Sequence, residues 1–237
     1  FDAANNRSLS STNQITLRGS PLILPAGEVS TTFDGGFDWK RIESEDSRTA
    51  ADTKLTRARW EVGTNVSIPI AERGGAWGAI GDVSISFSGG LEELSDFGTL
   101  IDANTGLNWG VSDGLDLSAN YIYTQVAPSL TQLRSPEIQT LNVPVFDFVT
   151  GQTVLATVIT GGNQDLQAET QKDWKFAANW RFPLSENSRL TAEYVRNRSS
   201  NVTSAFPSVT QAIEAAFPDR IVRDGSGQLI EVDRRPI

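Results

Sequence analysis

Apolar and polar side chains alternate with a period of two along this chain, over segments longer than ordinary strands. From Val29 to Trp39 every second residue is apolar or small, whereas the interleaved residues from Glu28 to Lys40 are polar or small. Successive side chains of a strand point to opposite faces of a sheet, so one face of this segment is apolar and the other is polar. A strand of a soluble protein usually has about five or six residues. A tilted strand that crosses a bilayer needs roughly 9–11 residues, so the length of the pattern favours membrane-crossing strands.

The pattern recurs along most of the chain, which argues against a chance alternation. It predicts strands near residues 28–42, 54–70, 79–90, 98–111, 114–126, 171–182 and 187–198, with a less regular one from Ile15 to Leu24. The expected fold class is therefore all-β, an antiparallel transmembrane β-barrel to which this chain contributes about eight strands. Periodicity alone leaves a soluble antiparallel sheet with one solvated face as an alternative.

The polar face of the predicted strands carries charged side chains. Burying Arg57, Arg59 and Glu61 inside a dry sandwich would be costly unless they were paired, so we expect this face to meet water, which in a wide barrel is the lumen. The residues expected to line the lumen are Arg57, Arg59, Glu61, Asp82, Asp102, Asn104, Asn108, Asp116, Asn120, Lys175 and Arg181. On the apolar face, aromatic residues near strand ends are expected to form girdles at the two membrane interfaces. These residues are Trp39, Trp60, Trp109, Tyr121, Tyr123, Trp180 and Phe182.

The links between predicted strands alternate between short and long. Short turn sequences occur at 25–27, 71–79, 112–114 and 183–187, whereas the links at 43–53, 91–97, 128–169 and 199–237 are charged or long. This alternation predicts periplasmic turns at one barrel end and extracellular loops at the other, with residues 1–237 forming part of one barrel domain. Outer loops meet a ligand first, so we expect ligand contacts in the loop at 128–169. The candidate ligand-binding residues there are Phe146, Phe148, Asn163 and Asp165.

Composition narrows the possible functions. The formal charge of −9 argues against nucleic acid as a partner, because phosphate binding needs a basic surface. The chain has no His and no Cys, which excludes thiolate metal sites and Ser-His or Cys-His catalysis within it. No run of about 18 apolar residues predicts a transmembrane helix. We expect no enzyme activity, no metal and no cofactor, and we interpret residues 224–227 as a hairpin turn joining 220–223 to 228–233.

Two motifs resemble a known family. Residues 162–170, with the sequence GNQDLQAET, resemble the G-N-P-x-L-x-P-E-x signature of TonB-dependent outer-membrane receptors, although Gln164 and Ala168 replace both prolines. Upstream, residues 127–133, with the sequence APSLTQL, are similar to the A-P-S-L-x-x-L segment that precedes that signature in the family. The segment from Phe217 to Pro236 also looks like an outer-loop insertion of some of these receptors.

The resemblance implies a barrel of about 22 strands in the bacterial outer membrane, closed by a plug, that imports a scarce nutrient with energy from the TonB complex. The implied partners are outer-membrane lipid, the TonB complex acting through a plug, and a small-molecule ligand of the siderophore, cobalamin or oligosaccharide class. Within these residues we find no plug, TonB box or aromatic-ended terminal strand, so the resemblance covers a mid-barrel portion. Two alternative functions are a passive porin or structural barrel, and a soluble β-sandwich binding module.

Overall fold

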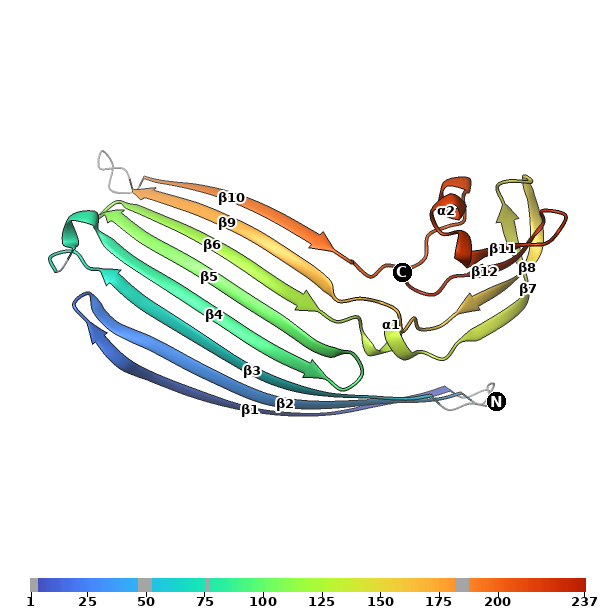
Figure 1. Cartoon of the computed structure of the whole chain (residues 1–237), viewed down its shortest axis with the longest axis horizontal. Helices are drawn as coiled ribbons and strands as arrows, with labels where there is room; N and C mark the ends of the chain where they lie inside the picture. Colours follow the sequence, from blue (N-terminus) through green and yellow to red (C-terminus); the bar gives the residue numbers. More distant parts are fainter. Residues whose placement is uncertain (1–3, 47–52, 76, 182–187) are drawn as a thin grey trace.

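Eight antiparallel strands form one long sheet in the computed structural model, which describes residues 4–46, 53–75, 77–181 and 188–237 (Figure 1). The strand order is β1-β2-β3-β4-β5-β6-β9-β10. The bounds are β1 Ala4–Leu24, β2 Gly27–Asp46, β3 Thr53–Ala71, β4 Asp82–Leu94, β5 Gly98–Ser112, β6 Leu115–Val126, β9 Glu169–Arg181 and β10 Arg189–Ser200. The predicted all-β, antiparallel architecture is confirmed, and it includes a strand of 21 residues in the segment that looked irregular.

These strands are long for a soluble sheet. Their lengths run from 12 residues in β6 and β10 to 21 residues in β1, so each exceeds the roughly 9–11 residues that span a bilayer at a tilt. A register shift between Gly19 and Leu22 interrupts the pairing of β1 with β2. This irregularity explains why the alternation is weak in that part of the sequence.

The register pairs apolar residues with apolar residues across the sheet. Phe37 lies opposite Trp60, with ring centroids 4.4 Å apart, and Tyr121 lies opposite Trp174, with centroids 4.6 Å apart. Directly opposed residues share a face, so the alternation of each strand adds up to two continuous surfaces. We call the surface that carries Phe37 and Tyr121 the apolar face, and the opposite surface the polar face.

Two expectations about strand limits need correction. The acidic segment 91–97 is not a long link, because β4 continues to Leu94, β5 begins at Gly98, and three residues make the turn. Glu92 and Glu93 therefore belong to a strand. The strand expected from residue 79 begins at Asp82, after a short 3-10 turn, η1 (Gly78–Ile80). Phe182 and the predicted turn at 183–187 lie outside the described residues.

A second, four-stranded sheet is built from the segments 128–169 and 199–237. Its strands are β7 (Ile138–Asp147), β8 (Gln152–Thr160), β11 (Ile221–Arg223) and β12 (Leu229–Asp233), in the order β11-β12-β8-β7. The expected hairpin at 224–227 joins β11 to β12, and β12 pairs in parallel with β8. Figure 1 shows this small sheet beyond the end of the large sheet that is opposite the short links.

One apolar core holds the small sheet together. Its buried residues come from both segments and are Val145, Ala156, Val158, Phe206, Val209, Ile221, Leu229 and Val232. Short helices complete the unit: α1 (Leu130–Arg134) before β7, and α2 (Gln211–Ala216) and the 3-10 turn η2 (Pro218–Arg220) before β11. The segments 128–169 and 199–237, which leave the large sheet, thus pack against each other.

Candidate functional site

An aromatic pair lies on the uncovered face of the small sheet. Phe146 is near the end of β7 and Phe148 follows the strand; their rings meet edge-on with centroids 4.8 Å apart. Val145 and Asp147 point into the core side, so the alternation turns Phe146 outward. The two phenylalanines are 47% and 52% exposed. The structure therefore brings these two candidate residues together on an accessible apolar surface.

Beneath this pair, a buried ionic network joins the two segments of the small sheet. Arg223 of β11 donates hydrogen bonds from Nη1 and Nη2 to the two carboxylate oxygens of Asp147, at 2.9 and 2.8 Å. The same guanidinium donates from Nε and Nη2 to Glu214 of α2, at 2.5 and 2.7 Å. The backbone N–H of Val149 and the hydroxyl of Thr150 also donate to Asp147, whose side chain is fully buried.

The network is charged in all three members. Hydrogen bonds from Arg223 hold the pKa of Asp147 and that of Glu214 below their usual values, against the opposing effect of burial. Hydrogen bonds to Glu214 and Asp147 raise the pKa of Arg223 further above its ordinary value. Because the group is buried and paired, its chemistry is that of a structural clamp under the aromatic pair.

Asn163 and Asp165, the other two candidate ligand residues, lie in a different setting. The Asn163 amide nitrogen donates to the carbonyl of Pro236 at 2.9 Å, and its side-chain oxygen accepts from the backbone N–H of Asp165 at 3.0 Å. The backbone N–H of Asn163 donates to the carbonyl of Gln132 in α1. Asn163 is only 6% exposed, so its polar atoms serve to fasten the returning chain to α1 and to the residues after β12.

The eleven residues expected to line the lumen all lie on the polar face. Across neighbouring strands, Glu61 opposes Glu92, Asp82 opposes Gly110, and Asn120 opposes Lys175. Arg59 makes ion pairs with Asp38, Glu61 and Glu92, drawn from β2, β3 and β4. Arg181 lies 4.0 Å from Asp116.

Arg57 has a more specific position than the sequence indicates. Its Nε and Nη2 bond both carboxylate oxygens of Asp96 at 2.7 and 2.9 Å, and Nη2 also donates to the carbonyl of Pro128 at 3.0 Å. The Asp96 side chain is 2% exposed. Arg57 therefore ties the β4–β5 turn to the start of the segment that leads into α1.

A pocket that the sequence analysis did not predict lies beside the Arg57–Asp96 pair. The pocket has a volume of about 430 Å³ and lies between the β4–β5 turn, α1 and the chain returning to β9. It is lined by Asp96, Phe97, Leu133, Arg134, Gln164, Leu166, Gln167 and Ala168. One available signal was Ser129, which caps α1: its hydroxyl accepts from the backbone N–H of Gln132, and the Gln132 side chain accepts from the backbone N–H of Ser129. The ion pair between Asp147 and Arg223 could not be predicted from a local sequence pattern, because the two residues are 76 positions apart.

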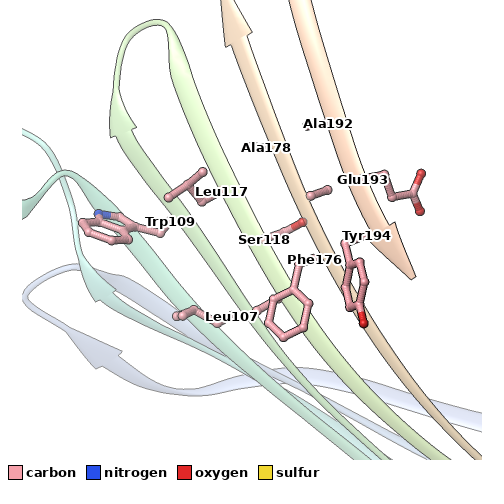
Figure 2. Close-up of a pocket in the computed structure, with 11 residues that line it drawn as sticks. Leu107, Trp109, Leu117, Ser118, Phe176, Ala178, Ala192, Glu193 and Tyr194 are labelled. Carbon is pink, nitrogen blue, oxygen red and sulfur yellow. The ribbon is translucent and has the colours of Figure 1, made fainter. Parts of the chain in front are cut away.

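The apolar face has its own depression, which spans β5, β6, β9 and β10 (Figure 2). It is lined by the small side chains of Ala119, Ala178 and Ala192 and by larger apolar residues. These larger residues are Leu107, Trp109, Leu117, Phe176 and Tyr194. The depression encloses about 470 Å³ and is almost entirely apolar. Trp109 is fixed at its margin, since its indole N–H donates to the carbonyl of Ile80 at 2.6 Å.

Among the described residues, no helix combines the length and the apolar character needed to cross a membrane. The Asp and Glu side chains of the same residues form no group of three or more that could hold a metal ion.

Comparison by sequence finds no family model and no curated protein that matches this chain. Comparison by structure finds similar receptors. The siderophore receptor PirA from Acinetobacter baumannii has a TM-score of 0.66 and 11% identity, with 98% of this chain and 32% of that chain covered. The ferric enterobactin receptor PfeA from Pseudomonas aeruginosa, in a variant form bound to enterobactin, has a TM-score of 0.67 and 13% identity, with 98% and 31% covered. PirA from Pseudomonas aeruginosa has a TM-score of 0.60 and 17% identity, with 98% and 37% covered.

This chain therefore spans about a third of the length of the receptors it resembles. The match includes the small sheet as well as the large one, because only 2% of the chain falls outside it. The resemblance to TonB-dependent receptors noted in the sequence motifs is confirmed as a resemblance of structure. The fold is that of one section of a siderophore-receptor β-barrel.

Proposed function

We propose that this chain is the middle section of a TonB-dependent outer-membrane receptor that captures a siderophore-class ligand and imports it with TonB-derived energy. The observation that carries the proposal is the match over 98% of the chain to siderophore receptors, by a sheet whose strands are long enough to cross a bilayer. The similar proteins are receptors and not enzymes, which supports a role in binding and transport.

In this proposal the two faces of the large sheet meet different environments. The apolar face meets lipid, while the polar face, with Arg59 and its three carboxylate partners, borders a hydrated lumen or a plug. Arg57 holds the outer end of the wall to the α1 segment through Asp96 and Pro128. The short links lie on the periplasmic side and the small sheet on the extracellular side.

Ligand capture is assigned to the small sheet. Phe146 and Phe148 offer an exposed apolar contact that is held in place by the clamp of Asp147, Arg223 and Glu214. Asp165, which is exposed, is a second possible contact, whereas Asn163 is assigned a structural role because both of its side-chain polar atoms are bonded within the protein.

Uptake of radioactive iron by cells that express the full-length parent protein tests the function. The probes are ferric enterobactin, a ferric hydroxamate and ferric citrate, supplied one at a time. We expect at least one probe to bind at the cell surface with or without TonB, and to enter only when TonB is present. Entry at an unchanged rate without TonB would identify a passive pore instead.

The capture site is tested by changing Phe146 and Phe148 together to alanine in the same cells. Surface binding of the transported probe is expected to weaken, because exposed aromatic side chains supply much of the contact energy at binding sites. The matched control is Leu141→Ala, which removes an apolar side chain that is 68% exposed in the same sheet. Equal binding by the double variant and the control would remove the aromatic pair from the site.

A further inference from the structure

The β7–β8 hairpin, which forms one edge of the small sheet, exposes no charged side chain (Figure 1). Between Ile138 and Thr160 the only charged residue is Asp147, although 21% of the whole chain is charged. The Asp147 side chain is fully buried, and Arg223 bonds both of its carboxylate oxygens. The part of the hairpin that a ligand can touch is therefore uncharged.

Apolar and hydroxyl side chains build the outward surface of this hairpin. The register pairs Phe146 with Thr153 and Pro144 with Leu155, and paired residues share a face of the sheet. The Phe148 ring packs against Phe146, and Leu155 is 60% exposed. We call Pro144, Phe146, Phe148, Thr153 and Leu155 the hairpin face.

The charges around the hairpin face are mainly negative. Beneath it, Asp147 and Glu214 share one guanidinium, that of Arg223, so this buried group keeps a net negative charge. On the outward side of the neighbouring strand β12, Glu231 lies opposite Thr157 and makes no ion pair or hydrogen bond through its side chain with the described residues. Together the segments 128–169 and 199–237 hold nine acidic and five basic residues.

The two arginines of these segments that make no ion pair with described residues lie at the other end of the hairpin. The backbone N–H of Arg234 donates to the carbonyl of Ile159 at 2.8 Å, and Ile159 is six residues along β8 from Thr153, or about 20 Å. Arg134 ends α1, and the residue after it accepts a hydrogen bond from the backbone N–H of Gly162, beyond the end of β8. Salt screens exposed charges within about 8 Å at physiological ionic strength. Neither arginine therefore offsets the negative charge around the hairpin face.

This arrangement disfavours an anionic ligand. The negative surroundings repel an anion during its approach, and the hairpin face offers it no cation on contact. A ferric trihydroxamate is electrically neutral, because each hydroxamate gives a single negative charge to Fe³⁺. A ferric tricatecholate is strongly anionic, because each catecholate gives more than one.

We propose that the hairpin face selects a neutral ferric trihydroxamate over an anionic ferric tricatecholate. Phe146 and Phe148 pack against the apolar parts of the ligand, and the Thr153 hydroxyl donates to a hydroxamate oxygen. This inference deepens the proposed function and rests on it, because it assigns a ligand class to the capture site on the small sheet.

Equilibrium dialysis of the full-length parent protein, purified in mild detergent, measures the selection. The probes are ferrichrome, a neutral trihydroxamate, and ferric enterobactin, an anionic tricatecholate, each loaded with radioactive iron. We expect the wild type to bind ferrichrome about tenfold more tightly than ferric enterobactin, because only the anionic probe is repelled.

A charge placed on the hairpin face tests whether this surface makes the selection. Thr153→Lys puts a cation opposite Phe146, and we expect it to reduce the ratio of the two affinities about tenfold by attracting ferric enterobactin. The matched control is Thr160→Lys, which adds the same charge at the exposed end of β8, about 23 Å away, and should leave the ratio as in the wild type. If Thr153→Lys does not fold, Gln152→Lys places the cation one residue earlier, at the exposed start of β8.

The outcomes separate this inference from the proposed function. A wild type that binds ferric enterobactin as tightly as ferrichrome overturns the selection and leaves the receptor function in place. Binding of neither probe also overturns the selection, and if ferric citrate fails to bind as well, the proposed function is overturned with it. A ratio that Thr153→Lys and Thr160→Lys change equally, or that neither changes, would show that the hairpin face does not make the selection.

Discussion

Arg223 connects three elements of the small-sheet unit: β11, the end of β7, and α2. Its guanidinium bonds Asp147 from the end of β7 and Glu214 from α2, so a single side chain joins two segments that are far apart in sequence. Asp147 is completely buried and Arg223 is 18% exposed at the side chain. Removing one member of such a pair leaves a charge without a partner in a poorly solvated place.

Arg223→Gln is therefore expected to destabilise the small sheet by about 3 kcal/mol. Hydrogen exchange of the β7, β8 and β12 amides in the full-length protein should become about a hundredfold faster, while the large sheet is unaffected. Arg234→Gln is the control, because Arg234 is exposed and directly follows β12, the strand that pairs with β11. Equal exchange in the two variants would mean that the ionic network contributes little to the stability of this sheet.

The response to pH should change sign in the same variant. In the wild type the folded pKa values of Asp147 and Glu214 lie below their unfolded values, so their contribution is complete above about pH 4 and is lost as the pH falls through the lowered pKa values. Without Arg223, burial raises the pKa of Asp147, so acidification should first stabilise the variant. Between pH 7 and pH 4, exchange rates corrected for intrinsic exchange should stay constant in the wild type and fall in the variant. Parallel slopes would contradict the assignment of Arg223 as the partner of Asp147.

At the scale of elements, the sequence predicts the large sheet well because period-two alternation is a local signal. The strand pairings place each predicted apolar set, such as Phe33 and Phe37, on one face. The prediction failed at Glu92 and Glu93, because two adjacent acids look like a loop. In the structure they point to opposite faces, where Glu92 pairs with Arg59 and Glu93 accepts a hydrogen bond from Thr99.

In the small sheet, local sequence patterns predict only some of the strand pairings. Val143, Val145, Val154, Ala156 and Val158 alternate in the sequence, and Gly151 supplies the positive φ of 70° in the turn between β7 and β8. The β7–β8 hairpin could therefore have been predicted within residues 128–169, which the sequence analysis treats as a loop. The parallel pairing of β12 with β8 could not be predicted, since it joins Val232 to Val158, which lies 74 residues earlier in the chain.

The two faces of the large sheet give a direct test at this scale. Val66→Arg or Leu107→Arg in the full-length protein places a charge on the apolar face, which near mid-bilayer costs about 2–4 kcal/mol. Asn65→Arg and Asn108→Arg are the matched changes, one residue away on the polar face. We expect heat-modifiable gel migration to show impaired assembly for the first pair only. Similar assembly of all four variants would argue against a lipid-facing surface.

At the scale of the whole molecule, the two ends of the large sheet differ in construction. At one end the links are short: Arg73, on the β3–β4 link, is ion-paired with Asp82 and Asp113, and it donates to the carbonyl of Gly110. At the other end the chain leaves the sheet to build the small sheet, which carries its own core (Figure 1). In the proposed receptor, this asymmetry puts the small sheet on the extracellular side and the short links on the periplasmic side.

Single cysteines test that sidedness, since the chain has no native Cys. Gln152→Cys, at the exposed start of β8, is expected to react with a membrane-impermeant maleimide on intact cells. Ala79→Cys, exposed in η1 of the β3–β4 link, should react only after the outer membrane is opened. Gln152 is preferable to Thr150, whose hydroxyl bonds the buried Asp147 at 2.9 Å. Labelling of Ala79→Cys but not of Gln152→Cys on intact cells would invert the orientation, and the small sheet would then lie on the side from which a ligand cannot be captured.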